Sequence, residues 1–220
     1  MAFFILKHME FITKEIENYS ASHTQKEPEL LSQLNRETWA NVMTPRMLSG
    51  HMQGRILSMF SKIIQPKRII EIGTYTGYSA LCMAEGLKKN GMLHTIDNNE
   101  EYASIATKYF NRSIYSKNIK QYIGNGLDII PTLECNFQLA FIDADKQNYS
   151  NYFDLIIDKI DVNGYIIADN VLWSGKVTKN EKDNETIELD LYNKKMLSDP
   201  RIETILLPIR DGLMVSRKIK

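Results

Sequence analysis

Two strand-like runs in this chain end in oxygen-bearing side chains that could together hold a cation. One run closes with Phe141-Ile-Asp-Ala-Asp-Lys146 and the next closes with Ala168-Asp-Asn170. If these runs are neighbouring strands of a parallel sheet, Asp143, Asp169 and Asn170 meet at one edge of it. Two carboxylates and an amide oxygen, without His or Cys nearby, form an oxygen-only site that suits Mg, Ca or Mn. The competing interpretation is that each residue only caps the helix that follows it.

A second group of residues could bind a nucleoside. The segment 71–79 runs from a strand end through Gly73 and Gly77 into the start of a helix. Glycines permit a tight turn close to a ligand, and the first N–H groups of a helix are free to bind one. The dinucleotide fingerprint GxGxxG is absent, which disfavours a pyrophosphate-binding dehydrogenase. An ordinary tight turn between strand and helix explains this segment equally well.

Asp97 ends the next strand-like run, about twenty residues after the glycines. In a doubly wound sheet, a carboxylate at this place lies beside the glycine turn and can accept hydrogen bonds from both hydroxyls of a ribose. This position indicates a cofactor that contains a nucleoside. The alternative is that Asp97 caps a helix that begins near Asn99.

The composition favours one soluble α/β domain spanning residues 1–220. Lys plus Arg and Asp plus Glu both total 27, so the chain has no overall attraction to nucleic acid or anionic membranes. Cys82 and Cys135 lie in apolar contexts without metal-binding spacing, which indicates a reducing compartment. The opening apolar run is too short for a signal peptide or a membrane span. We therefore expect a cytoplasmic protein.

Strand-like runs and amphipathic helical stretches alternate after residue 67, which predicts a parallel sheet with helices on both faces. The strand-like runs cover 68–72, 92–97, 119–123, 137–142 and 164–168, and helical stretches include 79–89 and 100–114.

The two ends of the chain differ from this pattern. Runs 202–207 and 213–219 flank a turn, which predicts an antiparallel hairpin at one sheet edge. Residues 9–40 predict two helices separated by a polar break at 20–28, and residues 46–64 predict another helix. The expected fold is thus doubly wound and Rossmann-like, with a mostly parallel seven-stranded sheet and accessory helices within residues 1–45.

These motifs, in this order and spacing, resemble the cation-dependent class I S-adenosylmethionine O-methyltransferases. That family includes plant caffeoyl-CoA and animal catechol O-methyltransferases and many bacterial relatives, and the chain is most similar to a bacterial branch. The resemblance runs from about Met47 to the end and is most specific in FIDADK followed by DNVLW. Its other segments are EIGTYTGYSAL, TID, GNGLDIIPTL and LPIRDGL.

The resemblance implies roles for individual residues. It makes Asp143, Asp169 and Asn170 ligands of a divalent cation, with Lys146 beside the acceptor hydroxyl as general base and Asp143 also at the catalytic centre. For S-adenosylmethionine it implies a binding site formed by Met47, Ser49, Glu71, Gly73, Tyr78, Ser79, Asp97, Gly126 and Asp143. By base rates alone, Lys146 would instead be a solvated surface lysine.

The acceptor side leaves several alternatives open. Trp173 either lines an acceptor pocket or fills the core. The polar stretch 174–188 is either a substrate loop or a solvated loop. The position that counting aligns with a glutamate of animal catechol enzymes is Ile205, so the tail is more similar to the caffeoyl-CoA branch.

We therefore expect a small catechol-like or phenolic acceptor and a homodimer without membrane attachment. The first alternative is methylation of 5-hydroxyuridine in tRNA, for which scattered lysines could form a basic face. These lysines are Lys62, Lys67, Lys88, Lys89, Lys117 and Lys120. The second alternative is a module that binds S-adenosylmethionine without turnover, which would not need the metal and base residues.

Overall fold

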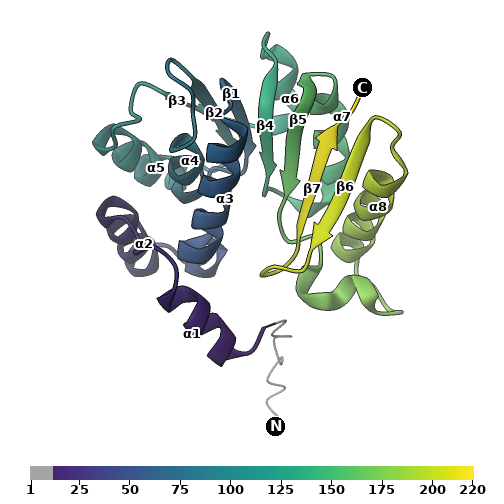
Figure 1. Ribbon diagram of the computed structural model, residues 1–220, viewed down its shortest axis with the longest axis horizontal. Coiled ribbons are helices and arrows are strands. Elements are labelled where there is room, and N and C mark those ends of the chain that lie inside the picture. The colour runs from purple at the N-terminus through teal and green to yellow at the C-terminus, as the bar shows by residue number, and fades with distance from the viewer. Residues whose placement is uncertain (1–11) are drawn as a thin grey trace.

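A seven-stranded sheet lies at the centre of the computed structural model, which describes residues 12–220 (Figure 1). Its strand order is β3-β2-β1-β4-β5-β7-β6, and β7 alone runs antiparallel to its neighbours. The strands are β1 (Arg68–Ile72), β2 (Met92–Asp97), β3 (Ile119–Ile123), β4 (Phe137–Ile142), β5 (Ile160–Ala168), β6 (Ile202–Leu207) and β7 (Leu213–Lys218). The predicted fold class, with its antiparallel hairpin at one edge, is confirmed.

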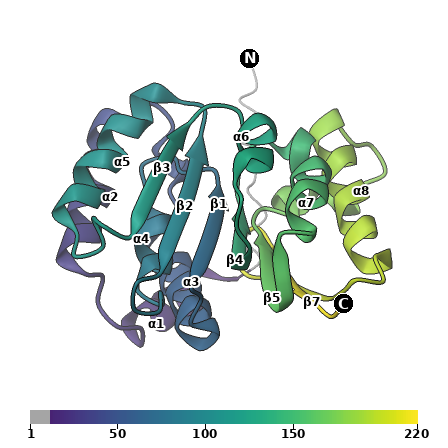
Figure 2. The ribbon, with the colours of Figure 1, turned by 90° about the horizontal axis from the view of Figure 1, so that it is seen from above.

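Helices cover both faces of the sheet, as the view from above shows (Figure 2). On one face pack α2 (Glu29–Asn41), α3 (Gly50–Ile64), α4 (Tyr78–Ala84) and α5 (Glu100–Arg112). On the other pack α6 (Gly126–Thr132), α7 (Tyr149–Ile157) and α8 (Asn184–Ser198). The short helix α1 (Lys14–Ser22) precedes them, and the 3₁₀ helices are η1 (Pro45–Met47), η2 (Lys146–Asn148) and η3 (Trp173–Thr178).

The central strands are buried on both faces, which explains why they are nearly continuous apolar runs. Ile69 points into the core beneath α3 and α4, whereas its neighbour Ile70 points into the core beneath α6 and α7. Leu139 and Ala140 of β4 divide between the two cores in the same way. This alternation fixes the register of β1 against β4 and therefore the relative position of their carboxyl ends.

The strand order changes direction between β1 and β4. Ile72 pairs with Ile142, and Ile142 pairs with Ala168, so the residues that follow these three positions leave the sheet side by side. A crevice forms outside the carboxyl ends of parallel strands at such a switch point. The polar segments singled out in the sequence therefore meet there.

Some predicted boundaries were wrong for local reasons. The helix predicted over 46–64 begins only at Gly50, because Leu48 has an extended backbone that separates η1 from α3. The helix predicted to reach residue 89 ends at Ala84, and Gly86 follows where any side chain would overlap the backbone of Ser61. The polar stretch 174–188 is not a loop throughout, since the Asp183 side chain caps α8 by accepting from the Thr186 N–H.

The two helices predicted within 9–40 are present as α1 and α2, and residues 9–11 of that prediction lie outside the described part of the chain. None of the helices in residues 12–220 combines the length and the apolar character that crossing a bilayer requires.

Candidate active site

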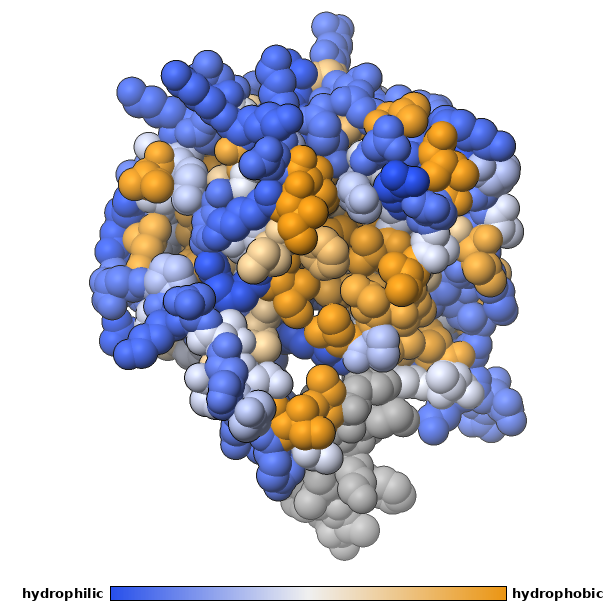
Figure 3. Space-filling model, in the orientation of Figure 1, coloured by the Kyte–Doolittle hydropathy of each residue, from blue (hydrophilic) through white to orange (hydrophobic). Residues whose placement is uncertain are grey.

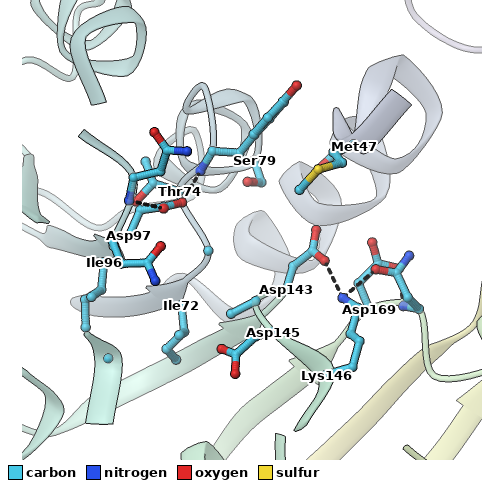
Figure 4. Close-up of a pocket in the computed structure, with 18 of the residues that line it drawn as sticks. Met47, Ile72, Thr74, Ser79, Ile96, Asp97, Asp143, Asp145, Lys146 and Asp169 are labelled. Atoms are coloured by element: carbon cyan, nitrogen blue, oxygen red, sulfur yellow. Dashed lines mark hydrogen bonds and ion pairs between the residues drawn. The ribbon is translucent and has the colours of Figure 1, made fainter. Parts of the chain in front are cut away.

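A cavity of about 760 Å³ opens at the carboxyl ends of β1, β2, β4 and β5 (Figure 4). Among the residues that line it are nearly all the predicted site residues: Met47, Ser49, Gly73, Tyr78, Ser79, Asp97, Gly126, Asp143, Lys146, Asp169, Asn170 and Trp173. Glu71 is the exception and does not line it. Segments that follow strands in both halves of the sheet, together with residues of the flanking helices, thus contribute to one site.

Asp97 holds the glycine turn beside the cavity. Its Oδ2 accepts a hydrogen bond from the Tyr75 N–H at 2.7 Å, and its Oδ1 accepts one from the Asn99 N–H at 2.9 Å. The cap of α5 is the side chain of Asn99, which accepts from the N–H groups of Glu101 and Tyr102. The alternative that Asp97 is the cap is therefore wrong. A carboxylate oxygen has two lone pairs, so Asp97 can still accept further hydrogen bonds.

The two glycines of the turn make room for protein atoms. Gly73 has φ of 104°, and a side chain there would place Cβ 2.1 Å from the carbonyl oxygen of Asp143. Gly77 has φ of 90°, and its Cβ would lie 2.7 Å from the Phe110 ring. We expected these glycines to admit a ligand, but their first effect is to let the turn pack on protein atoms, through Gly73 on the segment after β4 and through Gly77 on α5. The glycine turn and the Asp143 segment are thereby in contact.

Glu71 lies beneath the turn and is fully buried. Its carboxylate accepts from the Ser79 hydroxyl at 2.6 Å and from the Thr95 hydroxyl at 2.5 Å. Burial raises the pKa of Glu71 to about 8, although the two hydroxyl donors act in the opposite direction. The structure therefore places Glu71 behind Ser79 as a support. The Tyr78 hydroxyl is already engaged, since it donates to Glu27 at 2.6 Å.

Lys146 lies among the predicted cation ligands (Figure 4). Its Nζ donates to Asp143 Oδ1 at 3.1 Å and to Asn170 Oδ1 at 2.8 Å. A third bond goes to the Tyr149 hydroxyl at 2.7 Å. Lys146 is only 9% exposed, so it is not a solvated surface lysine.

Asp169 completes the cluster from the end of β5. It is 3% exposed, and its two oxygens accept from the Gln53 side-chain amide at 2.5 Å and from the Asn170 N–H at 2.7 Å. Burial, followed by the nearby charge of Asp143, raises the pKa of Asp169 to about 7. The Gln53 bond and the Lys146 charge oppose this rise. A pair of neighbouring, poorly hydrated carboxylates needs positive charge nearby.

The chemistry of this donor set fits a hard divalent cation. Asp143, Asp169 and Asn170 offer two carboxylates and one amide oxygen on adjacent strand ends, and an ammonium group already lies within hydrogen-bond distance of two of them. Oxygen donors of this kind are the usual ligands of Mg²⁺ and Ca²⁺. Within residues 12–220 no group of three or more His, Cys, Asp and Glu side chains could hold a metal ion. The predicted set contains only two residues of these types, and its third member is the Asn170 amide.

The loop after β5 has an unusual backbone. Asn170, Trp173 and Ser174 have positive φ values of 58°, 46° and 52°. Residues other than glycine adopt this conformation at an energetic cost, and such outliers are concentrated at functional sites. The loop brings Trp173 both to the cavity wall and against the core. That Trp173 contacts an acceptor stays a prediction. The Lys146 ammonium lies 5.7 Å from the centre of the Trp173 ring.

Two further residues of the site were missed by the sequence analysis. Gln53 lies on α3, more than one hundred residues before Asp169, and no local pattern connects them. Tyr149 is fully buried and its hydroxyl donates to the backbone oxygen of Asp169 at 3.0 Å. The only feature of the sequence that could have linked Tyr149 to the site is its spacing of three residues from Lys146.

The remaining predicted residues line the other walls. Ser49, 7% exposed, immediately precedes α3, and Met47, 60% exposed, lies in η1 just before it. Gly126 begins α6, with the Tyr152 ring packed against it. Ile205 lies in β6 and does not line the cavity, so it offers no replacement for a glutamate at the acceptor.

A family model described as O-methyltransferase matches residues 19–219. This chain belongs to the O-methyltransferase family. The prediction of an S-adenosylmethionine-dependent O-methyltransferase is thereby confirmed, whereas its place in a bacterial branch stays a prediction.

Individual relatives agree with this assignment. Caffeoyl-CoA O-methyltransferase 5 of Nicotiana tabacum is 34% identical over 208 residues, covering 88% of this chain and 86% of that protein. The caffeoyl-CoA O-methyltransferase of Petroselinum crispum is 33% identical over 207 residues, covering 88% and 86%.

Solved structures share the fold. The S-adenosylhomocysteine-bound methyltransferase PaMTH1 of Podospora anserina has a TM-score of 0.86 at 26% identity, with 94% of each chain covered. An O-methyltransferase of Bacillus cereus, solved with S-adenosylhomocysteine, has a TM-score of 0.86 at 24% identity, with 93% of this chain and 97% of that chain covered. At the latter identity the likeness establishes the fold only.

Proposed function

We propose that this enzyme transfers a methyl group from S-adenosylmethionine to a hydroxyl of a small catechol-like or phenolic acceptor, with the help of a divalent cation. The observation that carries the proposal is the position of Lys146, whose Nζ contacts Asp143 and Asn170 inside the same cavity that Asp97 borders. A base, a cation-binding oxygen set and a nucleoside-binding turn are then within one cavity.

The proposed cofactor site is the wall formed by the ends of β1 and β2. Asp97 would accept hydrogen bonds from the ribose, and Gly126 at the start of α6 would lie by the adenine. Met47 and Ser49 would border the methionine end. Bound there, S-adenosylmethionine would supply a methyl group on a positively charged sulfur.

The proposed cation site is Asp143, Asp169 and Asn170. A cation held by them would favour the deprotonated form of the acceptor hydroxyl. Mg²⁺ is the ion we propose, and the oxygen donor set also suits Ca²⁺ or Mn²⁺.

Lys146 would remove the acceptor proton. A cation bound beside Lys146 would favour its neutral amine form, and Nζ would then accept the proton as the O–H bond breaks. S-adenosylmethionine, when bound, would supply the methyl group to the oxygen and would keep the electrons of the carbon–sulfur bond that breaks. The chain needs no covalent intermediate for this displacement. Its residues align the reactants and exclude water, and Lys146 is already shielded from solvent.

The acceptor would lie against Trp173, whose ring forms part of the cavity wall. A flat aromatic side chain is suited to packing against a phenolic ring. Arg46 and Arg210 also line the cavity and are exposed, so they would meet acidic groups on the remainder of an acceptor. The curated relatives that are named for caffeoyl-CoA have an acceptor of this general kind.

The alternative acceptor is tRNA. The lysines considered for a basic face are mostly at the amino ends of the strands, with Lys67 preceding β1, Lys89 preceding β2 and Lys117 preceding β3. That edge of the sheet is opposite to the cavity. Phosphate contacts there would not direct a uridine into the site, so the arrangement favours a small acceptor.

A module that only binds S-adenosylmethionine is the least supported alternative. Such a protein would have no use for a buried lysine that donates to two side-chain oxygens. Burying polar and charged groups without a function costs folding free energy. Lys146, Asp143 and Asn170 are all present and in contact.

The decisive experiment is a labelled-methyl assay on metal-depleted protein with added Mg²⁺, Mn²⁺ or Ca²⁺. Catechols, caffeoyl thioesters and bulk tRNA would be offered in parallel. We expect cation-dependent labelling of catechols or caffeoyl thioesters and none of tRNA. Labelling of tRNA alone would replace the proposed acceptor, and binding of the cofactor without labelling of any acceptor would favour the non-catalytic module.

We also propose a homodimer. In the orientation of Figure 1, an apolar area lies over α3 and the uncovered side of β7 and β6 (Figure 3). Exposed apolar side chains on these elements include Met59 and Ile63 of α3, 60% and 73% exposed, and Ile205 of β6, 57% exposed. Contiguous apolar surface of this kind marks association sites. Sedimentation at micromolar concentration should show a dimer, and a monomer throughout would contradict it.

A further inference from the structure

We propose that Gln53 is a positioning residue that orients the Asp169 carboxylate for cation binding. The inference rests on the proposed function, because it assigns a role within the proposed cation site. Gln53 is 2% exposed, and its side-chain amide donates to Asp169 Oδ2 at 2.5 Å. The two residues are 116 positions apart, so this bond joins α3 to the end of β5 across the cavity.

The bond acts on the one proposed ligand that Lys146 does not hold. Lys146 donates to Asp143 and Asn170. Asp169 is instead held from two other sides, by the Asn170 N–H on Oδ1 and by Gln53 on Oδ2. The Asn170 bond comes from the adjacent residue of the same loop, so Gln53 is the side chain that fixes the carboxylate relative to the rest of the protein.

A glutamine suits this task chemically. Its NH₂ group can only donate, so the carboxylate stays the acceptor, and the amide brings no charge that would compete with a cation. Lysine or arginine at this position would neutralise Asp169. Hydrogen bonds from neighbouring residues to metal-binding side chains orient those side chains and raise the affinity of the site for the metal.

The helix that carries Gln53 is firmly anchored. Arg55 of α3 forms a largely buried ion pair with Glu85 at 2.6 Å. Gly54 packs so closely on α4 that an added Cβ would lie 2.6 Å from the Tyr78 ring. The donor atom of Gln53 therefore projects from a rigid element, which is the condition for holding a ligand side chain in place.

The test compares Gln53→Met with Ser61→Ala. Methionine keeps the length and most of the volume of glutamine but removes the donor. Ser61 is the matched control because it is also buried on α3 and donates one hydrogen bond, to the Met83 backbone oxygen at 2.6 Å, away from the cavity. Mg²⁺ and Mn²⁺ affinities of the metal-depleted full-length proteins would be measured by calorimetry, together with S-adenosylmethionine affinity and melting temperature.

We expect Gln53→Met to weaken cation binding by about 10- to 100-fold, the usual effect of losing an orienting partner of a metal ligand. S-adenosylmethionine affinity should stay near wild type, and Ser61→Ala should bind cations normally. If Gln53→Met fails to fold, Gln53→Asn gives the same comparison, since it keeps an amide that is one methylene too short.

Three results would overturn the inference. Unchanged cation affinity in Gln53→Met would contradict it while leaving the proposed cation site intact. Equal weakening in Gln53→Met and Ser61→Ala would show a general effect of packing in α3. Absence of cation binding by the wild-type protein would reject the proposed cation dependence and this inference together.

Discussion

At the ends of β1 and β2 the cavity borders a glycine turn that is bonded to one carboxylate, whereas at the ends of β4 and β5 it is lined by polar side chains that are joined through Lys146. On the first wall, Gly73 and Gly77 shape a turn in which the Tyr75 N–H donates to Asp97. On the second, the Lys146 ammonium donates hydrogen bonds to both Asp143 and Asn170. The two walls touch where Gly73 packs on the carbonyl of Asp143.

This difference predicts how each wall responds to substitution. A turn whose shape depends on glycine backbone should largely persist when one neighbouring side chain is removed, so losses there should be graded. A network of buried charges depends on every member, because removing one leaves its partners uncompensated. We therefore expect changes on the β4 and β5 wall to affect turnover strongly and changes on the β1 and β2 wall to affect mainly cofactor affinity.

The largest effect is expected for Asp143→Ala and Asp169→Ala. Each removes one carboxylate from the proposed cation site, and methyl transfer should fall by about 10³-fold or more, since a cation contributes several kcal/mol to such a reaction. The labelled-methyl assay measures the loss, with circular dichroism as the control for folding. Substantial turnover in either folded variant would contradict the expectation that changes on the β4 and β5 wall affect turnover strongly.

Lys146→Met should have the next largest effect, a fall in kcat of about 10²- to 10⁴-fold with little change in S-adenosylmethionine affinity. Lys146→Arg should rescue poorly, because arginine keeps the charge but cannot give up its proton at physiological pH. Stopped assays at saturating substrate would measure kcat. Near-normal turnover of the arginine variant would indicate an electrostatic role in place of a base.

Asp97→Ala tests the other wall and should weaken S-adenosylmethionine binding by about 1.5 to 3 kcal/mol, with kcat affected less. The lost interactions would be the proposed charge-assisted hydrogen bonds to the cofactor and the bond from the Tyr75 N–H. Calorimetry gives the affinity directly. If the affinity were unchanged, Asp97 would serve the turn alone.

Glu71→Gln should have the smallest effect on turnover, because Glu71 does not line the cavity, and its expected consequence is a change in how stability depends on pH. The pKa of Glu71 is raised from an ordinary value of 4.5 to about 8, so between these values the folded protein binds a proton that the unfolded chain releases. The free energy of unfolding should fall as pH rises through this window, by at most about 1.4 kcal/mol per pH unit. Urea denaturation at several pH values should show a flatter dependence in Glu71→Gln. If the free energy of unfolding depended on pH identically in both proteins, burial would not raise the pKa of Glu71 as described.

The same comparison explains how much could be predicted from the sequence. The strands around Ile70 and Leu139, and the turn at Gly73 and Gly77, depend on local patterns that the sequence displays directly. Parallel strand order then sufficed to bring Asp143, Asp169 and Asn170 to one edge, and the structure places them there.

What could not be predicted depends on packing between distant segments. Nothing near Gln53 indicates that its amide reaches Asp169. The position of Glu71 behind Ser79, outside the cavity lining, depends on how α4 packs on the sheet, which the sequence does not specify. Lys146 is buried beside the rings of Tyr149 and Trp173, against the usual exposure of lysine.

The most direct test of the account is methyl transfer by the wild-type protein after verified removal of metal, with labelled S-adenosylmethionine and a catechol acceptor. We predict no transfer by the metal-free protein, retained binding of S-adenosylmethionine, and recovery of transfer when Mg²⁺ is restored. Full transfer in the presence of chelator, with metal absent by elemental analysis, would contradict the central claim that Asp143, Asp169 and Asn170 act through a cation.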